Sequence, residues 1–157
     1  MPAKTKRTKR GKPRKRVAAP RRPVRKKPES LRVRAVSASL TVGDLDRSVA
    51  WYRDVLGFTV GERWEEGGTL RGVQMKAGHC DLLLNQDDFR KGQDRAKGAG
   101  VRLWLSTVQD LNALAERARA NGGVLDGAPS HTAWGAYVFG ITDPDGFRLT
   151  LIREERE

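Results

Sequence analysis

The sequence predicts an α+β fold made of two tandem modules, each with the element order strand, helix and three strands. Three observations support this prediction. Apolar residues alternate in short runs, two segments carry an apolar stripe at helical spacing, and the second half of the chain repeats the order of the first. We place one domain at residues 35–153, with its halves at about 35–89 and 101–153.

The first module begins with residues 36–42, where small polar and apolar residues alternate as in a half-buried strand. Asp44 or Asp46 is suited to cap the helix that follows, and an apolar stripe marks the buried face of that helix. Gly57 ends the helix. Glycine pairs and single glycines separate three further expected strands, at residues 58–64, 70–76 and 80–85.

The second module repeats this order after a linker at residues 90–100. A strand at 101–107 precedes a helix that Asp110 caps and that Gly122 and Gly123 end. The remaining strands are expected at residues 124–125, 136–142 and 147–152. A shift of 66 residues aligns the halves and superimposes Asp44 on Asp110, which indicates an internal duplication.

The net charge of +12 is unevenly distributed along the chain. Residues 1–34 hold 16 of the 31 Lys and Arg and a single acid, whereas residues 35–157 hold 15 basic and 18 acidic residues. A proline-rich segment of like charges cannot bury enough surface to fold, so residues 1–34 are predicted to be a disordered tail. Its basic clusters suit weak, salt-sensitive, sequence-independent binding of nucleic acid. A solubilising extension is the alternative.

Localisation follows from what the sequence lacks. No run approaches the ~18 apolar residues that a membrane span needs, and no apolar segment of a secretory signal follows the basic N-terminus. Cys80 is the single cysteine, so no intrachain disulfide can form. We therefore expect a cytoplasmic protein, and we interpret Cys80 as inert packing inside a strand.

Two motifs identify a family resemblance. Residues 42–58, Val-Gly-Asp-Leu-Asp-Arg-Ser followed by Trp-Tyr-Arg-Asp-Val-Leu-Gly-Phe, and the turn Asp-Pro-Asp-Gly-Phe at 143–147 resemble the vicinal oxygen chelate superfamily. This superfamily includes glyoxalase I, extradiol dioxygenases, fosfomycin-resistance enzymes and bleomycin-binding proteins. The resemblance implies a glyoxalase-like, cupped mixed sheet around a small-molecule cavity. It does not fix the function, because one scaffold carries many chemistries.

The resemblance also implies four positions where the superfamily's enzymes hold a divalent metal with His and Glu. The first corresponds to Ser37, and the 66-residue shift carries it to Leu103. The last corresponds to Thr150, which the repeat maps back to Leu84. None of these side chains suits a metal centre. A register error of one residue introduces only Asn85, Arg102 or Trp104. We therefore expect no cofactor and disfavour a divalent metal.

Without a metal, the cup is expected to bind a small molecule by shape, stacking and a few polar contacts. Four tryptophans supply aromatic faces that suit a planar or cationic ligand. No catalytic residue is assigned. The predicted ligand-binding residues are Ser37, Ser39, Gln74, Trp104, His131, Trp134, Tyr137 and Thr150.

Three functional hypotheses remain open. The first is a metal-independent protein that sequesters or senses a small molecule, similar to the bleomycin-resistance branch. The second is a lyase, isomerase or dioxygenase with non-standard ligands, for which His79, Asp81 and His131 are the candidates. The third is a nucleic-acid-associated protein that acts through the basic tail. The chain is expected to be a monomer that closes its own cup, or a homodimer.

Overall fold

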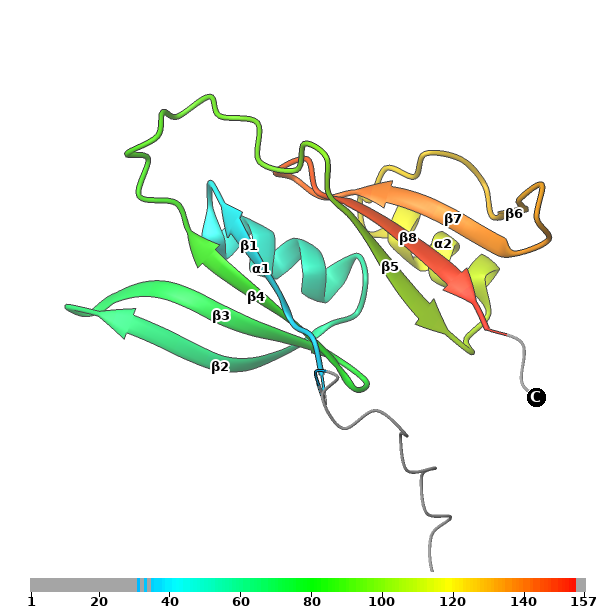
Figure 1. Ribbon diagram of the computed structural model, residues 1–157, viewed down its shortest axis with the longest axis horizontal. Coiled ribbons are helices and arrows are strands. Elements are labelled where there is room, and N and C mark those ends of the chain that lie inside the picture. Colours follow the sequence, from blue (N-terminus) through cyan, green and yellow to red (C-terminus); the bar gives the residue numbers. More distant parts are fainter. Residues whose placement is uncertain (1–30, 32, 34, 155–157) are drawn as a thin grey trace, which may run out of the picture. The chain divides into compact units, whose positions relative to one another are not determined.

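The computed structural model of this chain describes residue 31, residue 33 and residues 35–154. The predicted disorder of residues 1–34 therefore lies almost entirely outside the described residues. Within them, the two halves have the expected order of elements (Figure 1). Neither helix in this part of the chain has the length and apolar character needed to cross a membrane.

The first module forms a four-stranded mixed sheet with the strand order β1-β4-β3-β2. Strand β1 pairs in parallel with β4, and the other neighbours are antiparallel. The helix α1 packs on one face of this sheet, against β2, β3 and β4. Its elements are β1 (Ala38–Val42), α1 (Leu45–Asp54), β2 (Thr59–Glu66), β3 (Thr69–Ala77) and β4 (Cys80–Gln86).

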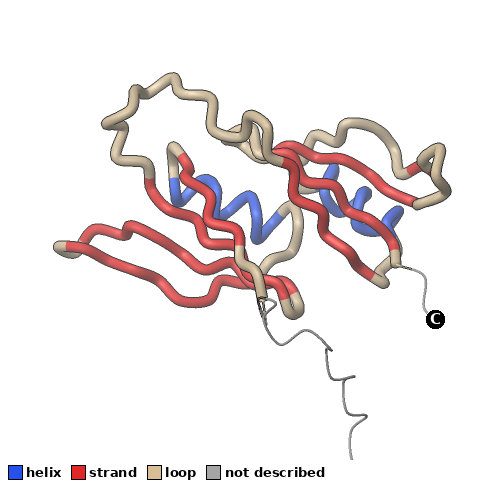
Figure 2. Tube along the Cα trace, in the orientation of Figure 1, coloured by secondary structure: helices blue, strands red, loops and turns tan. Residues whose placement is uncertain are grey.

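The second module repeats this topology, with the strand order β5-β8-β7-β6 and a parallel pair of β5 and β8. Its helix α2 packs against β7 and β8. Figure 2 shows the helix and strands of each module in the same orientation as Figure 1. The elements are β5 (Arg102–Thr107), α2 (Leu111–Ala120), β6 (Ser130–His131), β7 (Tyr137–Thr142) and β8 (Arg148–Arg153).

The predicted helix starts are confirmed. The side chain of Asp44 accepts a hydrogen bond from the Arg47 amide at 2.9 Å, and Asp110 accepts one from the Asn112 amide at 2.9 Å. Each bond satisfies an amide that has no partner within its helix. Asp44, rather than Asp46, is therefore the cap of α1.

Three local expectations are wrong. Residues 124–125 form no strand of their own and contribute only an isolated bridge between Leu125 and Ile141. His131 lies outside every expected strand, but it belongs to β6 and pairs with Tyr137. Cys80 is expected to be buried, but it is exposed at the start of β4. Each of these residues lies next to a turn or an element boundary, where local sequence patterns are least reliable.

Strand alternation divides each sheet into two faces. Leu40, Val73 and Leu84 are buried on the face that carries α1, and Leu149 and Leu151 are buried on the face that carries α2. We call the opposite face of each sheet, turned away from its helix, the open face. The two open faces belong to separate sheets, because no strand of one sheet pairs with a strand of the other among the described residues.

Candidate functional site

The open face of the first sheet is polar. Ser39, Gln74 and Asn85 alternate with the buried leucines and therefore point away from α1. The side-chain amide of Asn85 donates to the Ser39 hydroxyl at 2.8 Å, and that of Gln74 donates to the Asp81 carboxylate at 3.0 Å. Hydrogen bonding thus fixes the orientation of these amides on an accessible surface. Ser37 is exposed immediately before β1.

The open face of the second sheet carries two arginine side chains and a tryptophan. Arg102 and Arg148 lie directly opposite each other on the parallel strands β5 and β8, and Trp104 lies opposite Thr150 two residues further along. Both arginines are exposed, as is Trp104, whereas Thr150 is buried beside it. The ring of Trp134 lies 6.3 Å from that of Trp104. Two arginines and Trp104 therefore share this open face, and the ring of Trp134 adjoins that of Trp104.

A hollow of about 1130 Å³ lies beside the β6–β7 hairpin. His131, Trp134 and Tyr137 line it, and the rings of His131 and Tyr137 lie 4.8 Å apart. The Tyr137 hydroxyl donates to the side-chain oxygen of Asn112 in α2 at 3.0 Å. Tyr137 therefore points to the helix side of the sheet, away from the open face that carries Trp104.

The predicted ligand-binding residues thus fall into three places. Ser37, Ser39 and Gln74 belong to the first open face, Trp104 and Thr150 belong to the second, and His131 and Tyr137 line the hairpin hollow. Trp134 connects two of these places, because it lines the hollow and also approaches Trp104. Among the predicted ligand-binding residues, those of the second module therefore lie closest to one another.

Two of the four positions assigned to the superfamily's metal ligands, Leu84 and Leu103, need correction. Leu84 is fully buried against the helix side, and Leu103 packs against the core, so neither can face a ligand on the open face. Ala38 and Leu103 occupy equivalent places in the two sheets, paired with Leu82 and Leu149 respectively. The strands β1 and β5 are thus related by 65 residues rather than 66. Because Leu82 and Leu149 are then equivalent, β4 and β8 are related by 67 residues. The corrected positions on the open faces are Ser37, Leu83, Arg102 and Thr150.

This corrected set does not fit a divalent metal. A catalytic metal needs about three His, Cys or carboxylate ligands, whereas these positions supply two hydroxyls, one alkyl group and one permanently charged guanidinium.

The non-standard candidates are also separated. His79 lines a hollow of about 540 Å³ between the modules together with Cys80, and Asp81 bonds to Gln74 on the open face. His131 lies at the hairpin. No set of three such ligands converges anywhere in the described part of the chain.

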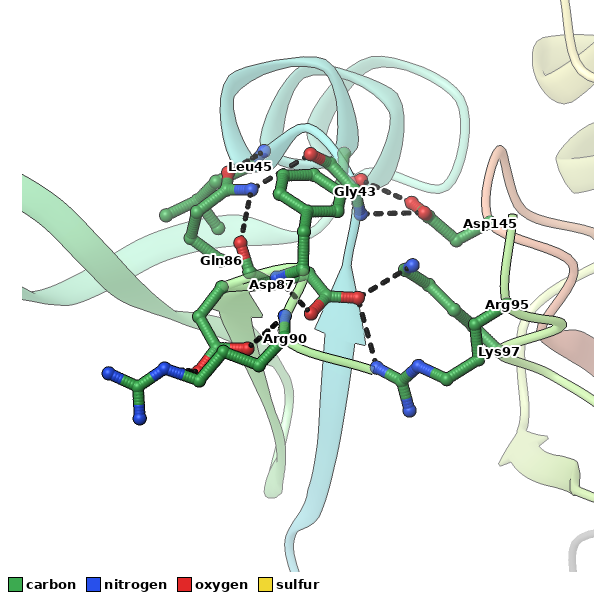
Figure 3. Close-up of polar contacts among 11 residues, drawn as sticks. Gly43, Leu45, Gln86, Asp87, Arg90, Arg95, Lys97 and Asp145 are labelled. Carbon is green, nitrogen blue, oxygen red and sulfur yellow. Dashed lines mark hydrogen bonds and ion pairs between the residues drawn. The ribbon is translucent and has the colours of Figure 1, made fainter. Parts of the chain in front are cut away.

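A charged cluster lies in the segment after β4, and no sequence pattern had indicated it (Figure 3). Asp87, just after β4, accepts a 2.7 Å bond from Lys97 and a 2.9 Å bond from Arg95, and both Asp87 and Lys97 are almost fully buried. The Lys97 and Arg95 bonds, with the Phe89 amide, hold the pKa of the Asp87 carboxyl well below its usual range. Phe89 has a left-handed backbone at φ 57°, which is uncommon for a non-glycine residue.

The turn between β7 and β8 joins the modules. The buried carboxylate of Asp143 accepts a 2.9 Å bond from the Tyr52 hydroxyl of α1, and Asp145 accepts from the Gly43 amide at 2.7 Å and from Ser48 at 3.0 Å. Burial raises the pKa of the Asp143 carboxyl, and burial together with the neighbouring carboxylate raises the pKa of the Tyr52 phenol. The family-like turn is therefore a structural joint between the two halves.

Sequence reasoning missed the arginine pair as a unit. The alternation of Arg102, Leu103 and Trp104 in β5 would have placed Arg102 and Trp104 on one face. The position of Arg148 opposite Arg102 depends on the register of β5 and β8, which no local pattern reveals.

Comparisons with known proteins identify the family and the fold. The family model described as the Glyoxalase/Bleomycin resistance protein/Dioxygenase superfamily matches residues 34–151. A lactoylglutathione lyase of Haemophilus influenzae is 30% identical over 121 residues, covering 74% of this chain and 89% of the relative. A probable lactoylglutathione lyase of Vibrio cholerae is 27% identical over 133 residues, covering 78% and 92%.

Solved structures agree with the described topology. The crystal structure of TioX from Micromonospora sp. ML1 superimposes with a TM-score of 0.63 at 21% identity, over 76% of this chain and 97% of that chain. At this level of identity the similarity concerns the fold alone.

Proposed function

Because this chain belongs to the Glyoxalase/Bleomycin resistance protein/Dioxygenase superfamily, we propose that it binds a small molecule on its open sheet faces without using a metal. The observation that carries this proposal is the chemistry of the four corrected positions. Ser37, Leu83, Arg102 and Thr150 supply no imidazole, thiolate or carboxylate with which to hold a divalent ion. Sequestration or sensing of the ligand needs no reaction, so it needs no such centre.

The open faces offer what a metal-independent binding site requires. Accessible tryptophan rings provide area for stacking, and oriented amides and guanidinium groups provide specific polar contacts. Except for Trp134, which lies in the turn between β6 and β7, these groups lie on strands, whose backbone positions are fixed by pairing. They are therefore held in place before a ligand arrives.

A thermal-shift screen of the full chain against small molecules, with and without a chelator, tests this function. A ligand at 100 times its Kd stabilises the folded state by about 2.7 kcal/mol, which raises the unfolding midpoint measurably. The expected result is at least one compound whose stabilisation is unchanged by chelation. Stabilisation that appears only with an added divalent metal would contradict the proposal.

A second candidate is a lyase acting on lactoylglutathione, favoured by the activity named for two relatives that align over most of their lengths. Incubation of the full chain with lactoylglutathione, with and without added Ni²⁺, Zn²⁺ or Mn²⁺, tests it by chromatography of the products. Turnover that requires the metal would replace the binding function with this one. Unchanged substrate under all conditions is the result that we expect.

A further inference from the structure

The arginine pair on the second open face is an unusual arrangement for a fold to maintain. Arg102 and Arg148 are directly opposite each other on adjacent strands, and like charges in this position destabilise a sheet. Neither arginine forms a salt bridge with any acidic side chain of residues 35–154. Their repulsion is therefore not relieved within the described part of the protein, but an anion bound between them would relieve it.

The pair lies at the edge of a hollow that can accept such an anion. Residues 98–101 of the linker and Gly146 of the β7–β8 turn line this hollow of about 450 Å³ together with Arg102 and Arg148. Guanidinium groups present forked N–H donors that match the two oxygens of a carboxylate, sulfonate or phosphate. Two forks on adjacent strands therefore suit one anionic group better than they suit separate water molecules.

Aromatic surface begins one step along the same strand. Trp104 follows Arg102 on the same face at a spacing of about 7 Å, which corresponds to two strand residues. Trp104 is 51% exposed and Trp134 is 65% exposed, and their rings, 6.3 Å apart and tilted by 48°, form one adjoining aromatic surface. Large aromatic side chains on an accessible face are typical of a binding surface rather than of core packing.

One carboxylate shares this face without neutralising the arginines. The side chain of Asp126 lies against Gly140, which pairs with Thr150, and it has no salt bridge among the described residues. This negative charge therefore lies beside β7, whereas the two arginines are on β5 and β8. A cationic aromatic ligand would have to approach both arginines, so the charge distribution favours an anion at this end.

Building on the small-molecule binding proposed above, we propose that the open face of the second sheet binds an aromatic compound with one anionic substituent. The ring stacks on Trp104 and Trp134, and the carboxylate, sulfonate or phosphate accepts hydrogen bonds from Arg102 and Arg148. The backbone positions of Arg102 and Trp104 are about 7 Å apart along β5, so a fused two-ring system bearing a directly attached anion is long enough to reach both side chains.

Titration calorimetry of the full chain with three matched probes tests this site. The probes are 2-naphthalenesulfonate, the neutral 2-naphthalenesulfonamide and the ring-free methanesulfonate. We expect the naphthalenesulfonate to bind at least about tenfold more tightly than either of the others, because each charge-assisted bond contributes about one power of ten or more. Substitution Trp104→Ala should weaken its binding several-fold.

A double variant separates the arginine pair from general charge. The double variant Arg102→Gln with Arg148→Gln should bind naphthalenesulfonate about a hundredfold more weakly. The unfolding midpoint of this variant should stay equal or rise, because the repulsion between the two arginines is removed. Arg119→Gln, on the exposed side of α2, changes the net charge elsewhere and should leave the affinity unchanged. The basic tail is present in every variant, so it cannot account for a difference between them.

Three results would overturn the proposed site. They are equal binding of the sulfonamide and the sulfonate, unchanged affinity in the double variant, and no detectable binding of the sulfonate at millimolar concentration. The broader binding function would survive each of them if the thermal-shift screen still found a ligand that is insensitive to chelation, so the two proposals fail separately.

Discussion

At the scale of single residues, buried polar side chains connect the two modules. Tyr52 and Asp143 come from different modules, and their hydrogen bond crosses the boundary between them. Asp143 also accepts bonds from the amides of Asp145 and Phe147, which form its own turn. A buried acceptor that loses a donor cannot regain one from water, so these contacts are costly to break.

Substitution Tyr52→Phe should therefore destabilise the protein by about 1–3 kcal/mol in urea unfolding, because it leaves the buried Asp143 carboxylate with one donor fewer. Tyr137→Phe is the matched control, since it removes a similar hydroxyl whose bond to Asn112 is exposed. A loss below about 1 kcal/mol is expected for this control. Equal losses in both variants would show that the boundary contact has no special role.

The charged cluster in the linker predicts a pH dependence. The pKa of Asp87 is depressed by hydrogen bonds from Lys97 and Arg95, so the cluster stabilises the fold above the usual carboxyl pKa of ~3.9. That stabilisation is lost as the pH falls through the lower pKa of the folded state, because the protonated carboxyl no longer pairs with the cations.

Substitution Asp87→Asn should thus lower the thermal midpoint by several degrees at pH 7, and the difference between the two midpoints should shrink progressively as the pH falls below about 4. Thermal unfolding of both proteins between about pH 2 and pH 7 measures this. Other carboxyl groups titrate equally in both proteins, so they cancel in the comparison. A midpoint difference that stays constant over the whole range would contradict the assigned role of Asp87.

At the scale of elements, local sequence patterns predicted most of the strands and helices. They predicted the alignment of equivalent strands in the two modules less reliably. Asp44 and Asp110 were correctly placed at helix starts, because capping depends on a few neighbouring residues. The positions of the candidate binding residues were harder to predict from the repeat. Two residues, Val108 and Gln109, separate β5 from the cap of α2, whereas only Gly43 separates β1 from the cap of α1. This extra residue changes the repeat from 66 at the helix caps to 65 between β1 and β5.

A difference of one residue exchanges the faces of a strand, so it determined which side chains could reach a ligand. It placed Leu103 on the open face in the prediction, whereas Arg102 lies there in the structure. The position of Arg148 opposite Arg102, and the burial of Lys97, depend on contacts between distant segments. Such contacts leave no periodic signal in the sequence, so the arginine pair and the linker cluster required the structure.

The linker also depends on a close approach of backbones. A Cβ at Gly98 would overlap the carbonyl group of Gly146 in the β7–β8 turn. Substitution Gly98→Ala should cost about 1–3 kcal/mol in urea unfolding, because one backbone segment must move. Gly127→Ala, whose added Cβ meets no atom within 4 Å, should change stability by less than about 0.5 kcal/mol. Equal stability of the two variants would exclude this close packing.

At the scale of the whole molecule, the sequence combines a strongly basic N-terminal segment with a mildly acidic remainder. The structure does not describe residues 1–30, so their role remains the prediction made from charge. A chain without these residues should lose binding to a DNA duplex together with its steep salt dependence, because the remainder has a net negative charge. Unchanged binding in fluorescence anisotropy after the truncation would exclude the segment as the cause.

The central claim is that this member of the superfamily binds its ligand without a metal. Its fold follows the family, whereas Ser37, Leu83, Arg102 and Thr150 stand at the open-face positions derived from the family pattern. Elemental analysis of the full chain, purified without chelator from cells grown with added Ni, Zn, Mn and Fe, tests this claim most directly. We predict a metal content far below one atom per chain. About one atom per chain of a single metal, removed by chelation together with ligand binding, would contradict it.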